Sequence, residues 1–554
     1  MRNAFRNYFF MGILMALVIA GDSWRLSGAG NSNHAGLSGH VRSDRGEPLA
    51  GIPVQAQLQG KNISVVVYTN KDGLYSFRDL PPGLHTLSVA VGGYQRLRKE
   101  SVEVKGQQPA QADLTLLLSP PSIHEMTSSE ILLALPGTTE EKSFFSECSN
   151  CHSLEYALQK KRDRAGWMAI IRKMRGITPS GAMMAKEIIE ETLAETKDKN
   201  ERLADFLVSI RGPESGDLPY KLLPRPVDDA STSAVITEYH IARGAVSATL
   251  RGDPRGAWVH DLMLEPKTGY LWYTDHFASI LSRLDPKSGE IKEYPFPHAK
   301  PGKQDGGFSL AFDRDGNILV GVLWQGTIAR FDPKTEKFTE WTIEEDARLG
   351  SVMPDASGMV WSSSSPTNGI YSLDPATGKF IKYTVPTHNS GIYGTAFDSK
   401  GGIYFCEMGA AKVGRFDTKT KKFAEWAVPT PDSWPRRLDV DLQDRLWFGE
   451  FHGARIGMFD PKSEKIREWK LSDNPYAAPY TVAVDNKNKT VWTTDFNSNL
   501  IYRFDQKTER FTKFLMPEPN LETRFLLVDS STTPATVWIP DYSPPGKILK
   551  LQAY

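Results

Sequence analysis

A short motif that recurs every 42 to 47 residues constrains the fold of the second half of this chain. Each copy is Leu or Phe followed by Asp, and the aspartates are Asp285, Asp332, Asp374, Asp417, Asp460 and Asp505. Strand-like runs rich in Trp, Tyr or Phe precede and follow the motif, as at residues 446–450 and 423–426. Four strands in a repeat of this length are typical of one blade of a β-propeller. We therefore predict an all-β propeller over residues 234–554.

The two ends of this region predict how the ring closes. Residues 525–554 supply three strand-like runs and stop before a fourth, whereas residues 235–239 form such a run ahead of the first repeat. If the early run completes the last blade, six whole blades and one composite blade make a seven-bladed ring. Such closure leaves only short, protected strand edges.

The second constraint is the motif Cys148-Ser149-Asn150-Cys151-His152. Two cysteines spaced in this way, with histidine directly after the second, are the pattern of c-type haem attachment. The thiols would hold one covalent haem c, and His152 would bind its iron as the proximal ligand. A redox dithiol or a disulfide remains possible, whereas zinc would need two more ligands and only Cys406 is left, which we expect to be buried in a strand.

Residues 128–212 around this motif are predicted to form a compact helical unit. Thr138 and Glu141 have the spacing of a capping box. Trp167, Ile171 and Met174 share one face of a later helix. Residues 203–210 resemble the last helix of small class I cytochromes c, which implies a small all-α cytochrome c domain with a methionine as distal iron ligand. The candidates are Met174, with core packing as an equal alternative, and then Met183 and Met184.

The helical unit also carries a basic run. Its members are Lys160, Lys161, Arg162, Arg164, Arg172, Lys173 and Arg175, against the single acid Asp163. A run of this kind is usually a solvated helix face. Near an exposed haem edge it would instead speed the encounter with an acidic redox partner protein.

Residues 37–118 alternate apolar and polar side chains in several short runs that are separated by turn residues, which predicts a small β-domain. Residues 37–41 and 54–58 are two of these strands, and Lys71-Asp72-Gly73 is one of the turns. The order of motifs from Gly39 to Tyr94 resembles the carboxypeptidase regulatory-like domain, a transthyretin-like β-sandwich. The resemblance implies an accessory domain, sometimes assigned to carbohydrate binding, so a small-molecule or glycan ligand is expected.

The N-terminus predicts export. Arg2 and Arg6 precede an apolar run over residues 8–20, and residues 1–21 match a secretory signal peptide. The run is shorter than the roughly 20 residues that span a bilayer, so no membrane span is expected in the mature chain. We therefore expect a periplasmic or otherwise exported protein. The 66 basic and 66 acidic residues balance, which gives no reason to expect a nucleic-acid partner.

Residues 213–233 are a linker rich in Pro, Gly and Asp. The repeats that follow this linker resemble the streptogramin (virginiamycin B) lyase family, in strings such as Trp447-Phe448-Gly449-Glu450-Phe451. The family implies a Glu-Pro-His-Gly string at the start of one inner strand, where histidine is the base and glutamate helps to bind magnesium. In this chain His260 meets the base position, but Trp258 stands at the glutamate position. Blade six has Ala478-Pro479-Tyr480-Thr481 instead. Because no blade has the pair, we do not expect streptogramin lyase activity, and His260 is the one candidate catalytic residue.

One concave end of the ring, the propeller mouth, is nevertheless predicted to gather polar side chains. The starts of the innermost strands place there His260, Phe308, Tyr393, Arg436, Tyr480 and Arg524, and the ends of the next strands place there Asp275, Glu407, Glu450, Asp495 and Asp541. The alternative is a set of salt bridges and turn-capping acids that the repeats inherit.

The sequence thus predicts a multidomain fold: β-sandwich, small all-α cytochrome c and seven-bladed all-β propeller. The function expected from it is an exported c-type cytochrome that carries electrons through its haem, with the propeller as a platform for a ligand or partner. The alternative is a propeller enzyme, streptogramin lyase-like or coupled to the haem, that acts at the mouth. The sequence leaves open whether the propeller holds a metal.

Overall fold

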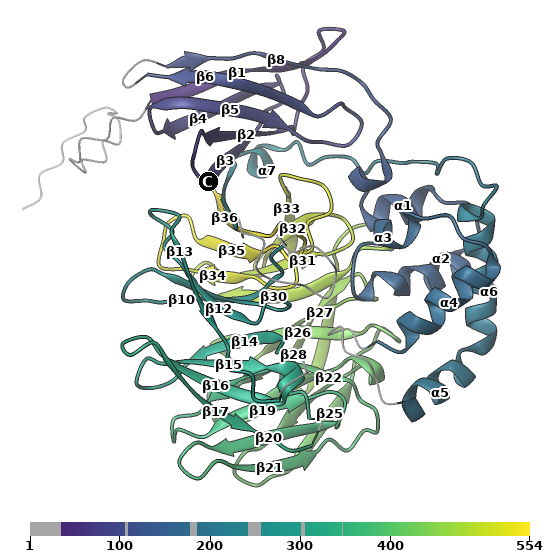
Figure 1. Cartoon of the computed structure of the whole chain (residues 1–554), viewed down its shortest axis with the longest axis vertical. Helices are drawn as coiled ribbons and strands as arrows, with labels where there is room; N and C mark the ends of the chain where they lie inside the picture. The colour runs from purple at the N-terminus through teal and green to yellow at the C-terminus, as the bar shows by residue number, and fades with distance from the viewer. Residues whose placement is uncertain (1–34, 106–108, 178–185, 242–255, 301–304, 346) are drawn as a thin grey trace, which may run out of the picture.

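The computed structural model describes residues 35–105, 109–177, 186–241, 256–300, 305–345 and 347–554. A β-sandwich lies at one end of the molecule, a helical unit covers one flank, and a β-propeller forms the rest (Figure 1). Within the described residues, no helix is both long and apolar enough to cross a membrane. The predicted signal peptide over residues 1–21 lies outside the described residues.

The sandwich packs two sheets around an apolar core that includes Leu37, Val54, Tyr75 and Leu87. One sheet contains β1 (Ala35–Ser43), β4 (Leu74–Leu80), β7 (Ala110–Gln111) and β8 (Leu114–Leu116), and the other contains β2 (Pro53–Leu58), β3 (Ile63–Tyr68), β5 (Gly83–Val89) and β6 (Leu97–Val104). The alternating runs predicted β1, β2, β4 and β5. Strand β3 was missed because Ile-Ser-Val-Val-Val-Tyr is nearly continuous in apolar residues and so lacks the alternation of a half-exposed strand.

Strand β3 joins the sandwich to the propeller. It pairs antiparallel with β9 (Ala234–His240), which itself pairs with the last strand of the chain, β36 (Lys547–Ala553). The result is one eight-stranded sheet in the order β34-β35-β36-β9-β3-β2-β5-β6. The outer edge of the last blade is therefore covered by the sandwich.

A buried polar network holds this junction. Glu238 of β9 is fully buried and accepts hydrogen bonds from Lys547 Nζ at 2.9 Å and from Ser64 Oγ at 2.9 Å. Burial alone would raise the pKa of Glu238, but the Lys547 charge, together with His240 and the hydrogen bonds from Lys547 and Gln55, outweighs burial and lowers it. Val66 and Leu549 pack beside the pair in a core that spans both domains. Partners within the network satisfy the buried charge.

Seven four-stranded blades are seen in the described part of the propeller. Blades one to three are β10 (Val259–Leu264), β11 (Leu271–Asp275), β12 (Ile280–Leu284), β13 (Ile291–Pro295); β14 (Gly307–Phe312), β15 (Ile318–Val322), β16 (Thr327–Asp332), β17 (Lys337–Thr342); and β18 (Met353–Pro354), β19 (Val360–Ser364), β20 (Gly369–Asp374), β21 (Lys379–Thr384). Blades four to seven are β22 (Ile392–Phe397), β23 (Ile403–Glu407), β24 (Lys412–Phe416), β25 (Phe423–Ala427); β26 (Pro435–Val440), β27 (Leu446–Glu450), β28 (Arg455–Asp460), β29 (Lys465–Lys470); β30 (Pro479–Asp485), β31 (Thr490–Asp495), β32 (Leu500–Asp505), β33 (Arg510–Leu515); and β34 (Leu527–Asp529), β35 (Thr536–Pro540), β36, β9. The composite last blade has the strand order that the two ends of the sequence predicted.

The repeated aspartate is explained by the turn between the third and fourth strands of a blade. Asp332 Oδ1 accepts the backbone N–H of Lys334 at 2.8 Å, and Asp460 Oδ1 accepts that of Lys462 at 2.9 Å. An Asp side chain that bonds the backbone two residues on closes such a turn without a ligand. The motif is therefore structural.

The helical unit contains α1 (Ser128–Ala134), α2 (Thr139–Ser146), α3 (Leu154–Leu158), α4 (Arg164–Arg175), α5 (Lys186–Glu195) and α6 (Lys197–Arg211). Phe145, Trp167 and Leu207 lie in its core. Thr138 caps α2 with Glu141 as predicted. Ser129 of α1 contacts Ser498 of the propeller, with 2.9 Å between the hydroxyl oxygens. The unit therefore rests on the propeller, beside blade six (Figure 1).

Candidate functional site

The inner strands of the propeller are irregular where they start at the mouth. The strand pairing of β10, β14, β22, β26 and β30 shifts register just after the first residue of each strand. A bulge of this kind re-aims side chains near functional sites. The bulge residues are consecutive pairs such as His260–Asp261 and Arg436–Arg437.

The acids predicted at the mouth fall into two groups. Three of them cap backbone: Asp275, Asp495 and Asp541 accept the N–H groups of Trp258 at 3.0 Å, Ala478 at 2.8 Å and Glu522 at 3.2 Å, respectively. These N–H groups belong to the residues two positions before His260, Tyr480 and Arg524. The capping interpretation thus holds for these acids, which position the starts of the inner strands.

Glu407 and Glu450 behave differently. Both side chains are fully buried, and neither carboxyl oxygen of either residue has a hydrogen-bond partner by distance and angle. Burial, with the neighbouring Glu425 and Glu468 as second causes, raises the pKa of Glu407 to about 8 and that of Glu450 to about 9. Both are therefore neutral acids at pH 7, and neither is an anionic ligand.

Arg436 and Tyr480 form the centre of the mouth, and both are fully buried. The guanidinium carbon of Arg436 lies 4.0 Å from the ring centre of Tyr480 and 4.4 Å from that of Phe451. The hydroxyl groups of Tyr480 and the half-buried Tyr393 are 2.8 Å apart. Gly449 allows this packing, because a Cβ there would lie 2.6 Å from the carbonyl oxygen of Pro479.

The charges around Tyr480 and Tyr393 shift the pKa values of the two phenols in opposite directions. Burial by itself would raise the pKa of Tyr480, but Arg436, Arg524 and Arg437 outweigh burial and lower it below that of an ordinary tyrosine. The pKa of Tyr393 is raised, first by burial and then by Tyr480. Tyr393 is therefore the hydrogen-bond donor, and Tyr480 is the phenol that loses its proton first.

His260, the candidate base, is buried and paired with Asp261. It is 1% exposed, its ring lies 4.2 Å from that of Phe308, and its Nδ1 lies 2.8 Å from Asp261 Oδ1. Asp261 in turn pairs with both terminal nitrogens of Arg437, at 3.0 and 2.8 Å. Burial lowers the pKa of His260 to about 3. A residue in this setting positions Asp261 and Arg437 and is a poor general base at pH 7.

The Cys-x-x-Cys-His segment lies directly on the mouth. Arg436 Nη2 donates to the carbonyl oxygen of Asn150 at 2.9 Å, and Arg524 Nη2 donates to that of Cys151. His452 Nε2 lies 2.8 Å from Asn150 Oδ1. Segments that are 286 to 373 residues apart in the chain thus meet at one site.

Glu522 was missed in the sequence. It is 2% exposed, and its carboxylate accepts the N–H of Ser153 at 3.0 Å and Arg524 Nη2 at 3.3 Å. Its signal was its place two residues before Arg524, which is the spacing of the Glu-x-His pattern with arginine in place of histidine. Asp261 and Arg437 were also missed, since the strand bulge that turns them toward the channel has no sequence signal.

Of the three predicted distal ligands, the structure describes Met174. Met174 is 37% exposed at the end of α4, so it does not share the buried face of Trp167 and Ile171. Met183 and Met184 lie outside the described residues. Cys148 and Cys151 are half-buried, and burial raises the pKa of the Cys148 thiol to about 12. Cys406 is fully buried in β23, as expected.

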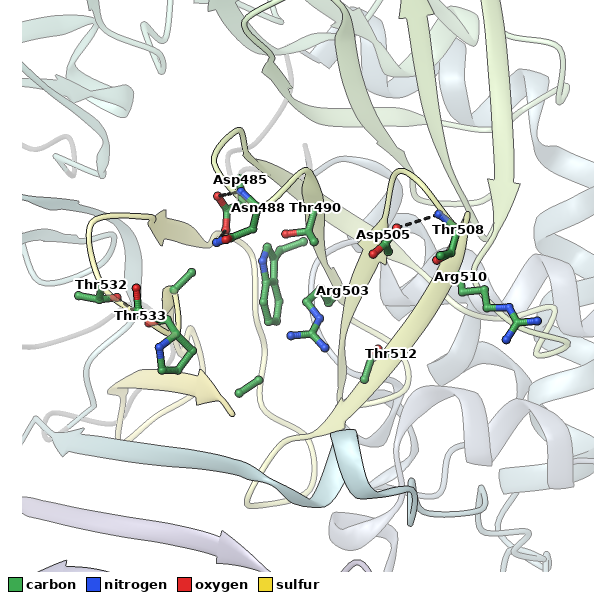
Figure 2. Close-up of a pocket in the computed structure, with 14 residues that line it drawn as sticks. Asp485, Asn488, Thr490, Arg503, Asp505, Thr508, Arg510, Thr512, Thr532 and Thr533 are labelled. Carbon is green, nitrogen blue, oxygen red and sulfur yellow. Dashed lines mark hydrogen bonds between the residues drawn. The ribbon is translucent and has the colours of Figure 1, made fainter. Parts of the chain in front are cut away.

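The propeller has a cavity in its central channel and a groove between two of its blades. One, of about 310 Å³, lies in the central channel and is lined by Asp261, Tyr393, Arg437 and Asp439 among others. A larger one, of about 440 Å³, is an open groove between blades six and seven (Figure 2). Its carboxylates Asp485 and Asp505 bond the residues of their own turns, and Arg503 and Arg510 also line it.

Comparison with known proteins agrees with this architecture. Residues 298–542 match the virginiamycin B lyase family, and residues 36–117 match the carboxypeptidase regulatory-like domain. The propeller is virginiamycin B lyase-like. None of the curated proteins matches this chain.

Solved structures resemble the lyase-like propeller. A virginiamycin B lyase from Staphylococcus aureus is 22% identical, with a TM-score of 0.50, and the match covers 58% of this chain and 100% of that one. A streptogramin B lyase is 22% identical over 59% of this chain and 100% of its own, with a TM-score of 0.51. A catalytically inactive variant of the S. aureus enzyme with quinupristin gives 22% identity, 58% and 100% coverage and a TM-score of 0.50. At this identity the likeness shows the fold.

The magnesium site that the lyase family implies does not fit this lyase-like propeller. At the glutamate position the chain has Trp258, Ala478 and Glu522, and Glu522 already bonds Ser153 and Arg524. Three guanidinium groups around the mouth would repel a divalent cation. No group of three or more His, Cys, Asp or Glu side chains that could hold a metal ion occurs among the described residues.

The electron-carrier function predicted from the Cys-x-x-Cys-His motif is wrong. The matched families cover most of the chain with a lyase-like propeller and a carboxypeptidase regulatory-like sandwich. The geometry gives the physical reason: a carrier docks through an exposed haem edge, whereas Asn150 and Cys151 face buried arginines of the propeller. A five-residue motif can predict at most the group that its own side chains bind. The function of the whole chain depends on the domains around the motif.

Proposed function

We propose that this protein is an enzyme that acts at the propeller mouth by abstracting a proton from its substrate, with Tyr480 as the base, in a lyase-type elimination. The observation that supports this is the paired phenols Tyr393 and Tyr480, 2.8 Å apart beside Arg436. In blade six, Tyr480 stands where the lyase family has its histidine. A phenol can replace the imidazole as a base at this position. Unlike imidazole, it must first lose its own proton and carry a negative charge.

The surrounding cations fit the chemistry of such a base. In the reaction, the Tyr480 phenolate takes a proton from a carbon beside a carbonyl or carboxylate group. The C–H electron pair forms a double bond, and the adjacent C–O bond breaks with its electrons going to the leaving oxygen. Negative charge develops on the substrate as the proton leaves, and preorganised guanidinium groups stabilise such charge in a site without water.

The first test is spectroscopic. Ultraviolet difference spectra from pH 6 to 11 should show one phenolate forming below the usual range of tyrosine, and this signal should be absent in Tyr480→Phe. The Tyr239→Phe variant serves as the matched control, because burial raises the pKa of that phenol. If the titration were unchanged in Tyr480→Phe, the phenol that titrates would not be Tyr480, and its assignment as the base would be wrong.

The second test is catalytic. Quinupristin and simple esters with a leaving group β to a carboxylate should give products with a new double bond, detected by absorbance and mass spectrometry. Turnover should persist with a chelator, fall at least 100-fold in Tyr480→Phe, and survive in His260→Gln when corrected for folded protein. Turnover that requires magnesium and disappears in His260→Gln would favour the family's own mechanism.

We propose in addition that Cys148 and Cys151 carry one covalent haem c with His152 as the proximal iron ligand, so that residues 128–212 are a c-type cytochrome-like unit. The residue types and spacing of the motif support this, and the half-buried thiols are accessible to a haem. When bound, the haem would supply one-electron redox chemistry beside the mouth, which makes a haem-coupled oxidoreductase the second candidate function. Export to the periplasm and binding of a glycan by the sandwich remain predictions.

The haem proposal is tested on the full chain made with a c-haem maturation system. The exported protein should keep haem in a denaturing gel and gain the mass of one haem, and the Cys148→Ser, Cys151→Ser double variant should not. Met174→Ala should change the iron–ligand absorption if Met174 is the distal ligand, with Met168→Ala as control. Haem that survives in the double cysteine variant would contradict covalent attachment.

A further inference from the structure

Two arginines at the mouth have more donor groups than partners. Arg436 is fully buried, and only its Nη2 is bonded, to Asn150; its Nε and Nη1 have no hydrogen-bond partner. Arg524 is 2% exposed, and its Nε is likewise without a partner. Buried polar groups are nearly always bonded, and an unpaired one destabilises the fold. These donors therefore indicate a ligand.

Docking of the helical unit accounts for only part of this arrangement. Each arginine uses one terminal nitrogen to hold the backbone of the Cys-x-x-Cys-His segment. The carbonyl oxygens that they bind belong to the consecutive residues Asn150 and Cys151, so the two guanidinium groups border the same short segment of backbone. A pair of neutral donors would hold the same backbone at lower cost, because burying a cation is expensive.

The charges at the mouth are also unbalanced. Asp261 neutralises Arg437, and Glu522 lies beside Arg524. Among the described residues, no carboxylate pairs with Arg436, which is instead stacked on Tyr480 and Phe451. The Nη2 of Arg436 has a second N–H besides the one that bonds Asn150, and with the unpaired Nε or Nη1 next to it this N–H forms the fork that binds a carboxylate with two parallel hydrogen bonds.

We propose that Arg436 and Arg524 form a carboxylate-binding site at the propeller mouth, directly beneath residues 148–152; the inference rests on the proposed function and names the class of ligand. Two sources supply this chemistry. One is a propionate group of a haem held by Cys148 and Cys151, and the other is the carboxylate of a free substrate, which would lie beside the Tyr480 phenol. Both would neutralise Arg436.

The first arm of the test uses the full chain produced without haem, with succinate as the probe and calorimetry as the readout. Succinate should bind, and binding should weaken at least tenfold in Arg436→Gln and in Arg524→Gln. The matched control is Arg503→Gln, an arginine that also lies over aromatic rings, Trp492 and Phe514, but far from the mouth. Circular dichroism and Arg436→Lys, which keeps the charge, separate lost binding from lost folding.

The second arm uses the haem-loaded protein and identifies the source. If the propionate is the ligand, succinate no longer binds, and Arg436→Gln shifts the midpoint potential of the haem. If a free carboxylate is the ligand, succinate binds as in the first arm and the potential is unchanged. Absence of succinate binding in the first arm, together with an unchanged potential in Arg436→Gln and Arg524→Gln, would overturn the site. Tyr480→Phe should leave succinate binding intact, so that this proposal and the proposed base fail separately.

Discussion

Tyr480 shows how local charge reverses the usual effect of burial on a phenol. Burial raises the pKa of Tyr68, Tyr239 and Tyr502 well above that of free tyrosine, because the interior disfavours an anion. Tyr480 is equally buried, yet three guanidinium groups lower its pKa. A buried tyrosine alone therefore says little about function, and the arginines around it decide whether it serves as a base.

Glu450 leads to a prediction about stability and pH. Its pKa is about 9 in the folded state against 4.5 as the ordinary value, so the folded chain binds more protons than the unfolded chain between these pH values. Stability contributed by this group is then fully present below about pH 4.5 and declines as pH rises toward 9. Glu450→Gln should raise the free energy of unfolding by about 1–3 kcal/mol at pH 8 and have little effect at pH 4.

The measurement for Glu450 is chemical denaturation from pH 4 to pH 9 for both chains. The slope of stability against pH should be shallower in the variant. Glu290→Gln, at an exposed turn, is the control and should leave the slope unchanged. A parallel pair of curves for Glu450→Gln and the natural chain would mean that Glu450 is ionised in the folded state.

At the scale of elements, the repeats predicted the blades because each carries its own turn chemistry and aromatic strand. The aspartates that close the turns, such as Asp332, bond only two residues away, and local contacts of this kind leave a readable pattern. The contact of Arg436 with Asn150 joins residues 286 positions apart and leaves none. The sequence therefore named Tyr480 and Arg436 as candidates for the mouth but could not predict that the Cys-x-x-Cys-His segment contacts this site.

Strand β3 gives a prediction at the same scale. It is a central strand that pairs with β2 on one side and β9 on the other, so proline at Val65 would remove ladder hydrogen bonds. Val65→Pro should lower stability by roughly 3 kcal/mol or more. Hydrogen exchange should show the loss of protection first in β3, β9 and β36.

The control for this strand is Val65→Thr, which keeps a β-branched side chain and the backbone N–H. It should retain protection in β9 and β36. If Val65→Pro loosened only the sandwich and left β9 protected, the shared sheet would not contribute to the stability of the last blade.

At the scale of the whole molecule, the helical unit lies beside the propeller (Figure 1), and its residues 150–153 bond Arg436, Arg524 and Glu522 at the mouth. The channel cavity of about 310 Å³ lies on the inner side of Arg437 and Tyr393. A ligand that arrives from this face has to displace the helical unit. We expect it to associate more slowly than the typical range of about 10⁵–10⁷ M⁻¹s⁻¹, because binding by this route requires a conformational change.

A cross-link tests this route. Ser129→Cys with Ser498→Cys places two thiols where the hydroxyl oxygens are 2.9 Å apart. The disulfide between the two cysteines should slow the association of succinate at least tenfold, and reduction of the disulfide should restore the rate. Stopped-flow fluorescence measures both rates. Ser129→Cys alone is the control. Equal rates in the oxidised and reduced forms would mean that ligands enter along the channel from the opposite end.

The sheet that runs from the sandwich into the last blade has a consequence for the order of folding. Strand β9 is made about 300 residues before β36, its other neighbour, so it would be an unpaired edge for most of the time that the chain emerges. The sandwich precedes it and presents β3 as a ready partner. We therefore expect the sandwich to act as a template that holds β9, the first strand of the ring, in register until β36 is made, and to protect this edge from aggregation.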